Sequence, residues 1–478
     1  MCFLFASYEY VFFFLPLLLI LTAVLRHFIR DAQMFAVCFR RGLAAASILF
    51  YASFGLNNLA VLAAQAVLGY TAHLILARGC RGRKILLPVL ILMFLGLLGF
   101  YKYGPFTLPI ALSFTTFSLI SLLMDTARGE IRECSPADCL LYFFFFPKLL
   151  QGPIQRYPDF QASLRKAETT APDARTMASA LLLFTLGLAK KVLLADVLAR
   201  PVDLAYSDPG KLLWLEALLT VFAYAFQIYF DFSGYCDMGM AAAWMLGFDL
   251  PVNFDQPYRS VNPAEFWKRW HSTLSQFLTR YLYIPLGGNR RGRMRMLVNT
   301  MIVFVLSGIW HGVGWGFLIW GLLHGLLVCI TKLFPRPLPL PRVIKAAFTF
   351  LAAAFLWVPF RAATLSDAWE VIRRALDKPW FVLHDRFIDP WRTDILWYPL
   401  KVLGVPDARA GGKICLMIIL AICFLLVFIF PDARRITDRF SKGTGTAGKV
   451  LMGVLTAALF VWCVLSFGEV SGFVYFDF

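Results

Sequence analysis

One histidine stands among neighbours that could turn it into a reactive group. His311 lies at the end of an apolar run, between Trp310 and Gly312, with Trp315 and further glycines close by. Small residues allow tight turns and close backbone approach, so this setting would hold an imidazole in a dry pocket. Such a ring could take a proton from a hydroxyl and return it later. The alternative is a structural histidine bonded to a backbone carbonyl.

A second histidine lies in a basic, tryptophan-rich stretch. His271 follows Arg269 and Trp270, with serines at the next position and one helical turn later. An amphipathic helix anchored at a membrane interface would explain the tryptophans and cations, but not this histidine–serine spacing. Both interpretations stay open. His324 lies in the middle of an apolar run, where a hydrogen bond between packed helices is the simpler explanation.

Segment 229–238 contains two acids, a serine and a glycine directly after another apolar run: Asp231, Asp237, Ser233 and Gly234. Ionisable residues in membrane spans are costly, so each is a functional candidate. The segment could be a broken helix lining a cavity, or an ordinary span end with solvated acids. The candidate site residues are therefore His311 and His271 as catalytic groups, with Asp231, Ser233, Asp237, Trp310, Trp270 and Arg269 as substrate- or donor-binding groups.

Motifs of several other enzyme classes do not occur in the sequence. There is no Gly-x-Ser-x-Gly elbow, no HExxH and no Walker loop, so hydrolase, zinc-protease and nucleotide-motor functions lack support. The ten cysteines are scattered, and the close pair Cys134 and Cys139 has no second pair or nearby histidines. We expect neither a metal site nor a disulfide framework.

The composition predicts an integral membrane protein. Of 478 residues, 59% are hydrophobic and 16% charged, and the mean hydropathy is +0.68, whereas soluble domains are about half apolar and about a quarter charged. The net charge of +17 lies in short clusters between apolar runs. This pattern is typical of cytoplasmic loops and argues against nucleic-acid binding.

A spanning helix needs about 20 mostly apolar residues. Two apolar pieces, 140–155 and 236–250, are interrupted by proline or glycine and could be re-entrant. The spans are expected near 9–25, 43–56, 59–77, 85–103, 107–126, 177–199, 213–231, 297–312, 315–331, 345–361, 414–430 and 450–467.

The basic clusters predict an orientation with both termini outside and the clusters in the cytoplasm. Segment 251–296 then becomes a cytoplasmic, membrane-surface helix with a basic tail. Segment 362–413, which contains the amphipathic piece 368–376, becomes extracytoplasmic. The whole chain, 1–478, is expected to form a single transmembrane domain.

Several motifs together resemble the membrane-bound O-acyltransferase (MBOAT) family, and within it the alginate O-acetyltransferase, or AlgI, type. The similarity runs from about residue 5 to the C-terminus. The motifs that carry it are 108–114, 125–130, 146–154, 187–192, 227–238, 269–290, 310–312 and 473–478.

This resemblance implies an all-α polytopic fold: a ring of about 11–12 transmembrane helices plus re-entrant segments, around a thinned centre with a cytoplasmic funnel. It implies that His311 is the family's catalytic histidine and His271 a second active-site histidine. One departure is Val313-Gly314, where the branch commonly has Ala-Asn, so any role of that asparagine is in doubt here. A D-alanyl exporter branch shares the Trp-His-Gly core.

The resemblance further implies O-acetylation of an extracytoplasmic polysaccharide such as alginate, from the inner membrane of a bacterial cell. No bound cofactor is expected; the donor would be a thioester, acetyl-CoA or an acyl carrier, attracted by the basic residues 268–295. The implied partners are a periplasmic SGNH-type acetyltransferase, a polysaccharide synthesis complex and membrane lipid. D-alanyl or peptidoglycan acyl transfer, a non-catalytic transporter or flippase, and a structural scaffold remain alternatives.

Overall fold

The computed structural model describes residues 3–79, 82–336, 339–379, 381–405, 407–443 and 445–467. Within these ranges the regular elements are all helical, which confirms the predicted all-α class. The C-terminal motif 473–478 lies outside the described residues. By length and composition, ten of the described helices could cross a membrane, which makes the chain a multi-pass membrane protein.

The chain divides into two compact units that share one long helix. The first unit comprises residues 1–188, 235–253 and 436–467, and the second comprises 189–234, 254–435 and 468–478. The shared helix is α11 (Trp214–Met245). The single domain expected over 1–478 stays a prediction.

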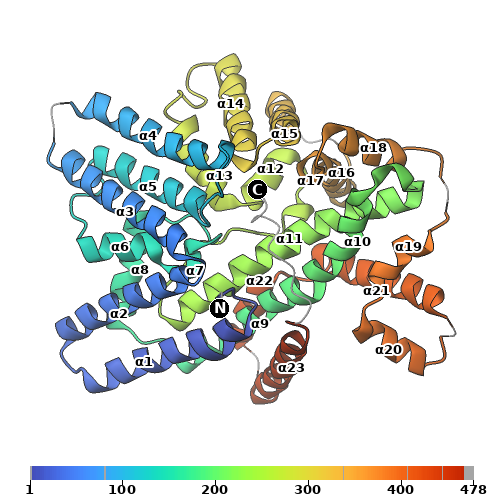
Figure 1. Cartoon of the computed structure of the whole chain (residues 1–478), viewed down its shortest axis with the longest axis horizontal. Coiled ribbons are helices and arrows are strands. Elements are labelled where there is room, and N and C mark those ends of the chain that lie inside the picture. The colour runs from blue at the N-terminus through green and yellow to red at the C-terminus, as the bar shows by residue number, and fades with distance from the viewer. Residues whose placement is uncertain are drawn as a thin grey trace. The chain divides into compact units, whose positions relative to one another are not determined.

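In the first unit, helices α3, α4 and α5 lie side by side, as Figure 1 shows. The short helix α6 ends at Phe144 and α7 ends at Leu149; residues 152–156, which follow a turn, are not helical. This unit contains η1 (Glu9–Phe14), α1 (Leu15–Phe28), α2 (Ala32–Ala52), α3 (Leu56–Ala77), α4 (Arg83–Tyr103), α5 (Leu112–Ala127), α6 (Pro136–Phe144), α7 (Phe146–Leu149), α8 (Tyr157–Thr169), α9 (Ala174–Ala189) and α23 (Thr446–Leu465).

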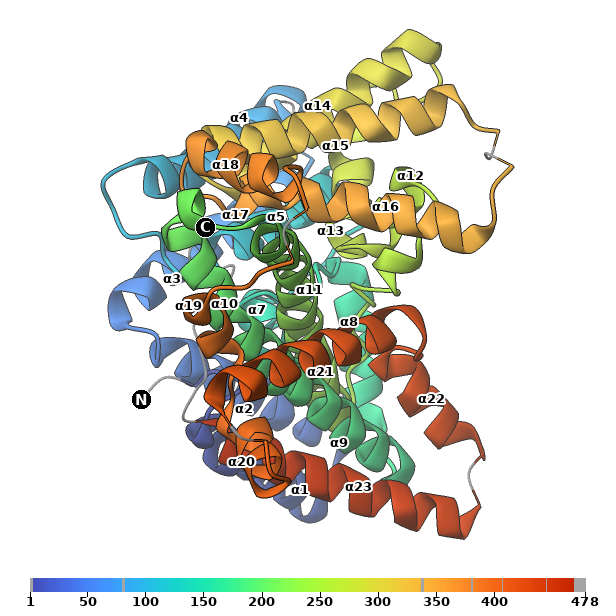
Figure 2. The ribbon, with the colours of Figure 1, turned by 90° about the vertical axis from the view of Figure 1, so that its right-hand side faces the viewer.

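In the second unit, helix α15 packs against α14 and against α16, as Figure 2 shows. Helix α22 (Ala433–Gly443) begins in this unit and continues in the first. The other elements are η2 (Lys190–Ala195), α10 (Asp196–Ser207), η3 (Pro209–Lys211), η4 (Pro257–Arg259), α12 (Pro263–Arg269), α13 (Ser272–Leu278), η5 (Thr279–Tyr283), α14 (Arg293–His311), α15 (Trp315–Leu333), α16 (Arg342–Leu356), α17 (Val358–Arg361), α18 (Leu365–Ala375), α19 (Asp385–Ile388), η6 (Asp389–Trp391), α20 (Asp394–Val402) and α21 (Ala408–Phe428).

Helix starts follow local capping chemistry. The Asp31 side chain accepts a hydrogen bond from the Met34 amide, so α2 begins at Ala32 and not near residue 43 as predicted. The cap outweighs the weak hydropathy of a first turn that precedes Arg40 and Arg41. Helix α18 (Leu365–Ala375) starts at a capping box between Thr364 and Asp367. It buries Ala368, Val371 and Ala375 on one face, which confirms the amphipathic piece expected at 368–376.

Two expected spans do not meet the length and composition of a spanning helix. The segment predicted at 107–126 forms α5, with 16 residues, because residues 104–111 are not helical and Ala111, directly before α5, has a left-handed backbone at φ 67°. The segment predicted at 177–199 belongs to a helical run in three pieces, α9, η2 and α10. Its charged residues lower the hydropathy that a span requires.

The predicted break after Asp231 is wrong, since α11 continues through Gly234 to Met245. Segment 251–296, where surface helices were expected, forms several short helices: α12 ends before His271, whose backbone is left-handed at φ 43°. Local periodicity reports neither the continuation of α11 nor the end of α12.

Candidate active site

The hairpin of α14 and α15 places His311. Helix α14 ends at this residue, whose side chain is only 5% exposed. The two helices touch through glycines: a Cβ on Gly308 would lie 2.4 Å from the Phe317 carbonyl oxygen, and one on Gly321 2.5 Å from that of Phe304. The small residues expected to permit close backbone approach therefore do so one turn before the histidine.

Aromatic rings enclose the His311 imidazole. Its centroid lies 4.5 Å from Trp310, 4.9 Å from Trp320 and 5.2 Å from Phe360, the last two at steep interplanar angles of 83° and 71°. Trp315, by contrast, is 69% exposed. The dry setting predicted for His311 is present, but the second tryptophan that encloses the ring is Trp320 and not Trp315.

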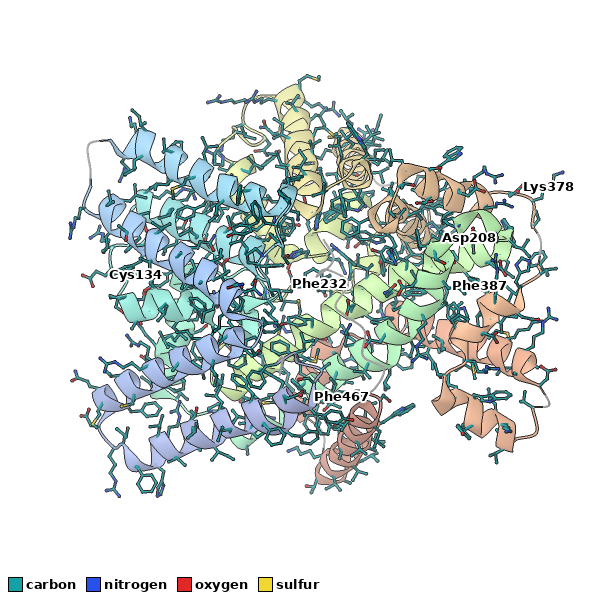
Figure 3. All side chains as sticks on the ribbon, viewed as in Figure 1. Cys134, Asp208, Phe232, Lys378, Phe387 and Phe467 are labelled. Carbon is teal, nitrogen blue, oxygen red and sulfur yellow. The ribbon has the colours of Figure 1, made fainter. Side chains whose placement is uncertain are left out.

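His271 is buried by a strained turn of the backbone. The residue is 1% exposed and its left-handed conformation is uncommon for a residue with a side chain. The imidazole packs edge-on against Phe232 of α11, at 4.9 Å and 80° (Phe232 is labelled in Figure 3). Burial lowers the pKa of His271 to about 3, so the ring is neutral near pH 7.

Both histidines border one aromatic cluster of the second unit. Trp270, the neighbour of His271 in sequence, lies 4.9 Å from Trp357. Trp357 stacks at 5.7 Å on Trp320, which contacts His311. The Trp357 indole N–H donates a hydrogen bond of 3.2 Å to the Tyr258 hydroxyl. This cluster connects two residues that lie far apart in the sequence.

Asp231 is buried in an ion pair. The alternative of an ordinary span end required a solvated acid, and the structure contradicts it for this residue. Its carboxylate lies 2.9 Å from Lys191 Nζ, which also lies 2.8 Å from Asp196. The Lys191 side chain is 7% exposed. Lysine therefore compensates two carboxylates inside the second unit. Its π-helical segment η2 is a rare geometry that is frequent at functional sites.

The remaining candidates have different surroundings. Ser233 is buried, and no hydrogen-bond partner of its hydroxyl lies among the described residues. Arg269 forms an ion pair of 2.6 Å with Glu265, one turn earlier on α12. Asp237 is half-buried and lies in the part of α11 that belongs to the first unit.

Sequence reasoning missed three contributors: Lys191, Trp320 and Trp357. Lys191 had a usable signal, since a charged residue in an apolar run is a functional candidate. Trp320 lies one helical turn before His324 and thus on the same face of α15. Trp357 carries no local signal. A buried imidazole among aromatic rings, such as His311, can exchange a proton with a bound hydroxyl.

Comparisons with known proteins agree with this chemistry. The model of the MBOAT, membrane-bound O-acyltransferase family, matches residues 69–358, which include His271 and His311. The Helicobacter pylori "Peptidoglycan O-acetyltransferase" is 32% identical over 421 residues, covering 77% of this chain and 79% of that protein.

Further relatives have related activities in their names. The Azotobacter vinelandii "Probable alginate O-acetylase AlgI" is 35% identical over 402 residues, covering 77% of each protein. The Streptococcus thermophilus "Teichoic acid D-alanyltransferase" is 24% identical over 292 residues, covering 54% of this chain and 69% of that protein. These similarities and the all-helical membrane fold show that the chain belongs to the membrane-bound O-acyltransferase family and is an O-acyltransferase.

Proposed function

We propose that the protein transfers acetyl groups from a cytoplasmic thioester, across the bacterial inner membrane, to hydroxyls of an extracytoplasmic polysaccharide such as alginate. The observation that carries this proposal is His311, a buried imidazole enclosed by aromatic rings at the end of α14. The relatives named for O-acetyl transfer at 32–35% identity support acetyl as the acyl group.

The step requires one base. The His311 imidazole takes the proton of an acceptor hydroxyl, and the oxygen attacks the thioester carbonyl. A tetrahedral intermediate forms with its negative charge on the former carbonyl oxygen. When it collapses, the C–S bond breaks and the thiolate leaves with the proton from His311. The products are an O-acetyl ester and a free thiol, so no further reactant is needed.

His271 assists the same reaction. It is neutral and buried, so it orients or polarises the acyl carbonyl without adding a fixed charge. The exposed arginines of 290–295 attract an anionic donor such as acetyl-CoA or an acidic carrier protein. A separate periplasmic acetyltransferase of SGNH type, within a polysaccharide synthesis complex, works with this protein to place the acetyl group on the polymer.

Radiolabelled transfer tests the proposal. Full-length protein in proteoliposomes receives [14C]acetyl-CoA, with alginate oligosaccharide or peptidoglycan fragments as acceptor. We expect label in the ester fraction, with His311→Ala reducing the rate by at least about 100-fold. His27→Ala is the matched control, because His27 is exposed at the end of α1. Wild-type transfer by folded His311→Ala would remove the proposal.

The same assay separates the alternatives. Transfer from a D-alanyl thioester but not from acetyl-CoA would favour the activity named for the Streptococcus thermophilus relative. A transporter would move the donor or acceptor without forming an ester. If the protein were only a structural scaffold, alanine at both His271 and His311 would leave its function unchanged.

A further inference from the structure

A third histidine, His324 on α15, lies inside the same aromatic cluster. It is 2% exposed. Its imidazole lies 5.0 Å from Trp267, 5.2 Å from Trp320 and 5.9 Å from Trp357, measured between ring centroids. Packing between helices would explain a buried ring, but it does not explain how the polar atoms of this ring are arranged.

The hydrogen bond to His324 determines where its proton is. The Trp267 indole N–H donates to His324 Nδ1 at 3.2 Å. An indole nitrogen can only donate, so Nδ1 must carry a lone pair and the neutral imidazole has its proton on Nε2. Among the described residues, Nε2 has no hydrogen-bond partner. A buried N–H without an acceptor is costly, which points to an acceptor supplied by a ligand.

Trp320 offers a second donor of the same kind. Its side chain is 1% exposed, and its indole nitrogen has no acceptor in the described part of the chain. The Trp320 ring contacts both His324, at 5.2 Å, and His311, at 4.9 Å. One of these N–H groups thus belongs to the ring that packs against the proposed base, the other belongs to a ring in contact with it, and neither has an acceptor among the described residues.

We propose that His324 Nε2–H and Trp320 Nε1–H donate hydrogen bonds to the carbonyl oxygen of the acyl group on which the His311-activated hydroxyl acts. This inference rests on the proposed acyl transfer and assigns its oxyanion stabilisation. When the hydroxyl oxygen attacks, negative charge develops on the carbonyl oxygen, and two neutral, preoriented donors stabilise it in a water-excluded site. Both groups keep their protons throughout, so His324 is neither base nor acid.

Two amide substitutions separate this role from packing. In His324→Gln the side-chain NH2 can reach the place of Nε2 and keeps the donor. In His324→Asn the side-chain oxygen can take the place of Nδ1 and keeps the acceptor for Trp267. We expect kcat to fall about 100-fold or more in the Asn variant and clearly less in the Gln variant, with similar KM. Trp320→Phe, which keeps a ring but loses the N–H, should also lower kcat more than KM.

The control histidine is His73, which is 1% exposed and has Nδ1 2.8 Å from Thr126 Oγ1. His73→Gln and His73→Asn should leave kcat within a few-fold of wild type if folding is retained, which the melting temperature in detergent checks. Higher kcat in His324→Asn than in His324→Gln, or wild-type kcat in both, would overturn the inference.

If both variants are folded but inactive, Trp320→Phe decides: a kcat loss supports the assignment and wild-type kcat rejects it. The proposed function fails separately, through an active His311→Ala.

Discussion

Lys191 Nζ lies 2.9 Å from the carboxylate of Asp231, and both side chains are buried. This ion pair connects η2 to α11 next to Phe232, the residue on which the His271 ring packs. Because a buried carboxylate without its cation would be strongly destabilised, the pair explains how an acid is tolerated within a long apolar helix. The pair also positions one wall of the candidate site.

Lys191→Met should strongly destabilise the protein. It leaves Asp196 and Asp231 without this compensating charge, at a cost of about 3–5 kcal/mol. The measurement is the melting temperature of the purified protein in detergent. Lys166→Met is the control, because its pair with Asp249 is more than half exposed and contributes at most about 1 kcal/mol. Equal melting temperatures for the two variants would refute the role of Lys191.

Burial of His271 should make stability depend on pH. Its folded pKa of about 3 lies below the unfolded value of about 6.5. The buried, neutral imidazole therefore contributes fully to the free energy of unfolding above pH 6.5. This contribution is lost as pH falls toward 3, because the unfolded chain binds the proton first.

For this one group the slope is at most about 1.4 kcal/mol per pH unit. Between pH 7 and 4, the melting temperature should change less with pH for His271→Gln than for wild type. The control is His27→Gln, because His27 is exposed; its melting temperature should depend on pH as that of wild type does. The same pH dependence for wild type and His271→Gln would contradict the prediction.

Gly308→Ala should separate α14 from α15. The added methyl would lie 2.4 Å from the Phe317 carbonyl oxygen, so the hairpin must shift, at about 1–3 kcal/mol. Since His311 lies one turn further on, acyl transfer should fall more than stability alone explains.

Gly42→Ala is the control, because a Cβ there meets nothing within 4 Å. In the helix α2 it should be neutral or stabilising by up to about 1 kcal/mol. Rates and melting temperatures that match in the two variants would argue against close packing at Gly308.

Glu216 should hold the segment that follows α18. Its buried carboxylate accepts from the Leu213 amide at 3.0 Å and from the His384 amide at 2.6 Å. Glu216→Gln places an amide NH2 against one of these donors, at about 1–3 kcal/mol. Tryptic cleavage within 377–392 should then be roughly tenfold faster.

The control for this experiment is Glu370→Gln, since Glu370 pairs with Arg373 and Arg374 on its own helix. Cleavage of that variant should stay at the wild-type rate. An unchanged rate in Glu216→Gln would mean that other contacts hold the segment.

Much of the helical architecture was predictable from local signals. In the described part of the chain, runs of apolar residues mark ten helices that could span a membrane, because hydropathy over about 20 residues is a property of the segment itself. Caps such as Asp31 and Thr364 likewise act within a few residues. Local patterns misplaced the ends of two helices. They suggested a break after Asp231, where α11 continues, and a continuous helix through His271, where α12 has ended.

The sequence by itself determined the all-helical membrane class, the family and the choice of His311 and His271, because composition, hydropathy and motif order are written in consecutive residues. Only the tertiary structure decided that Asp231 is compensated by Lys191, and that Trp320, not Trp315, encloses His311. It also decided that Trp267 and His324 share a hydrogen bond. The two members of each pair lie on different helices. The packing of the helices, which depends on many weak contacts at once, selects which side chains meet.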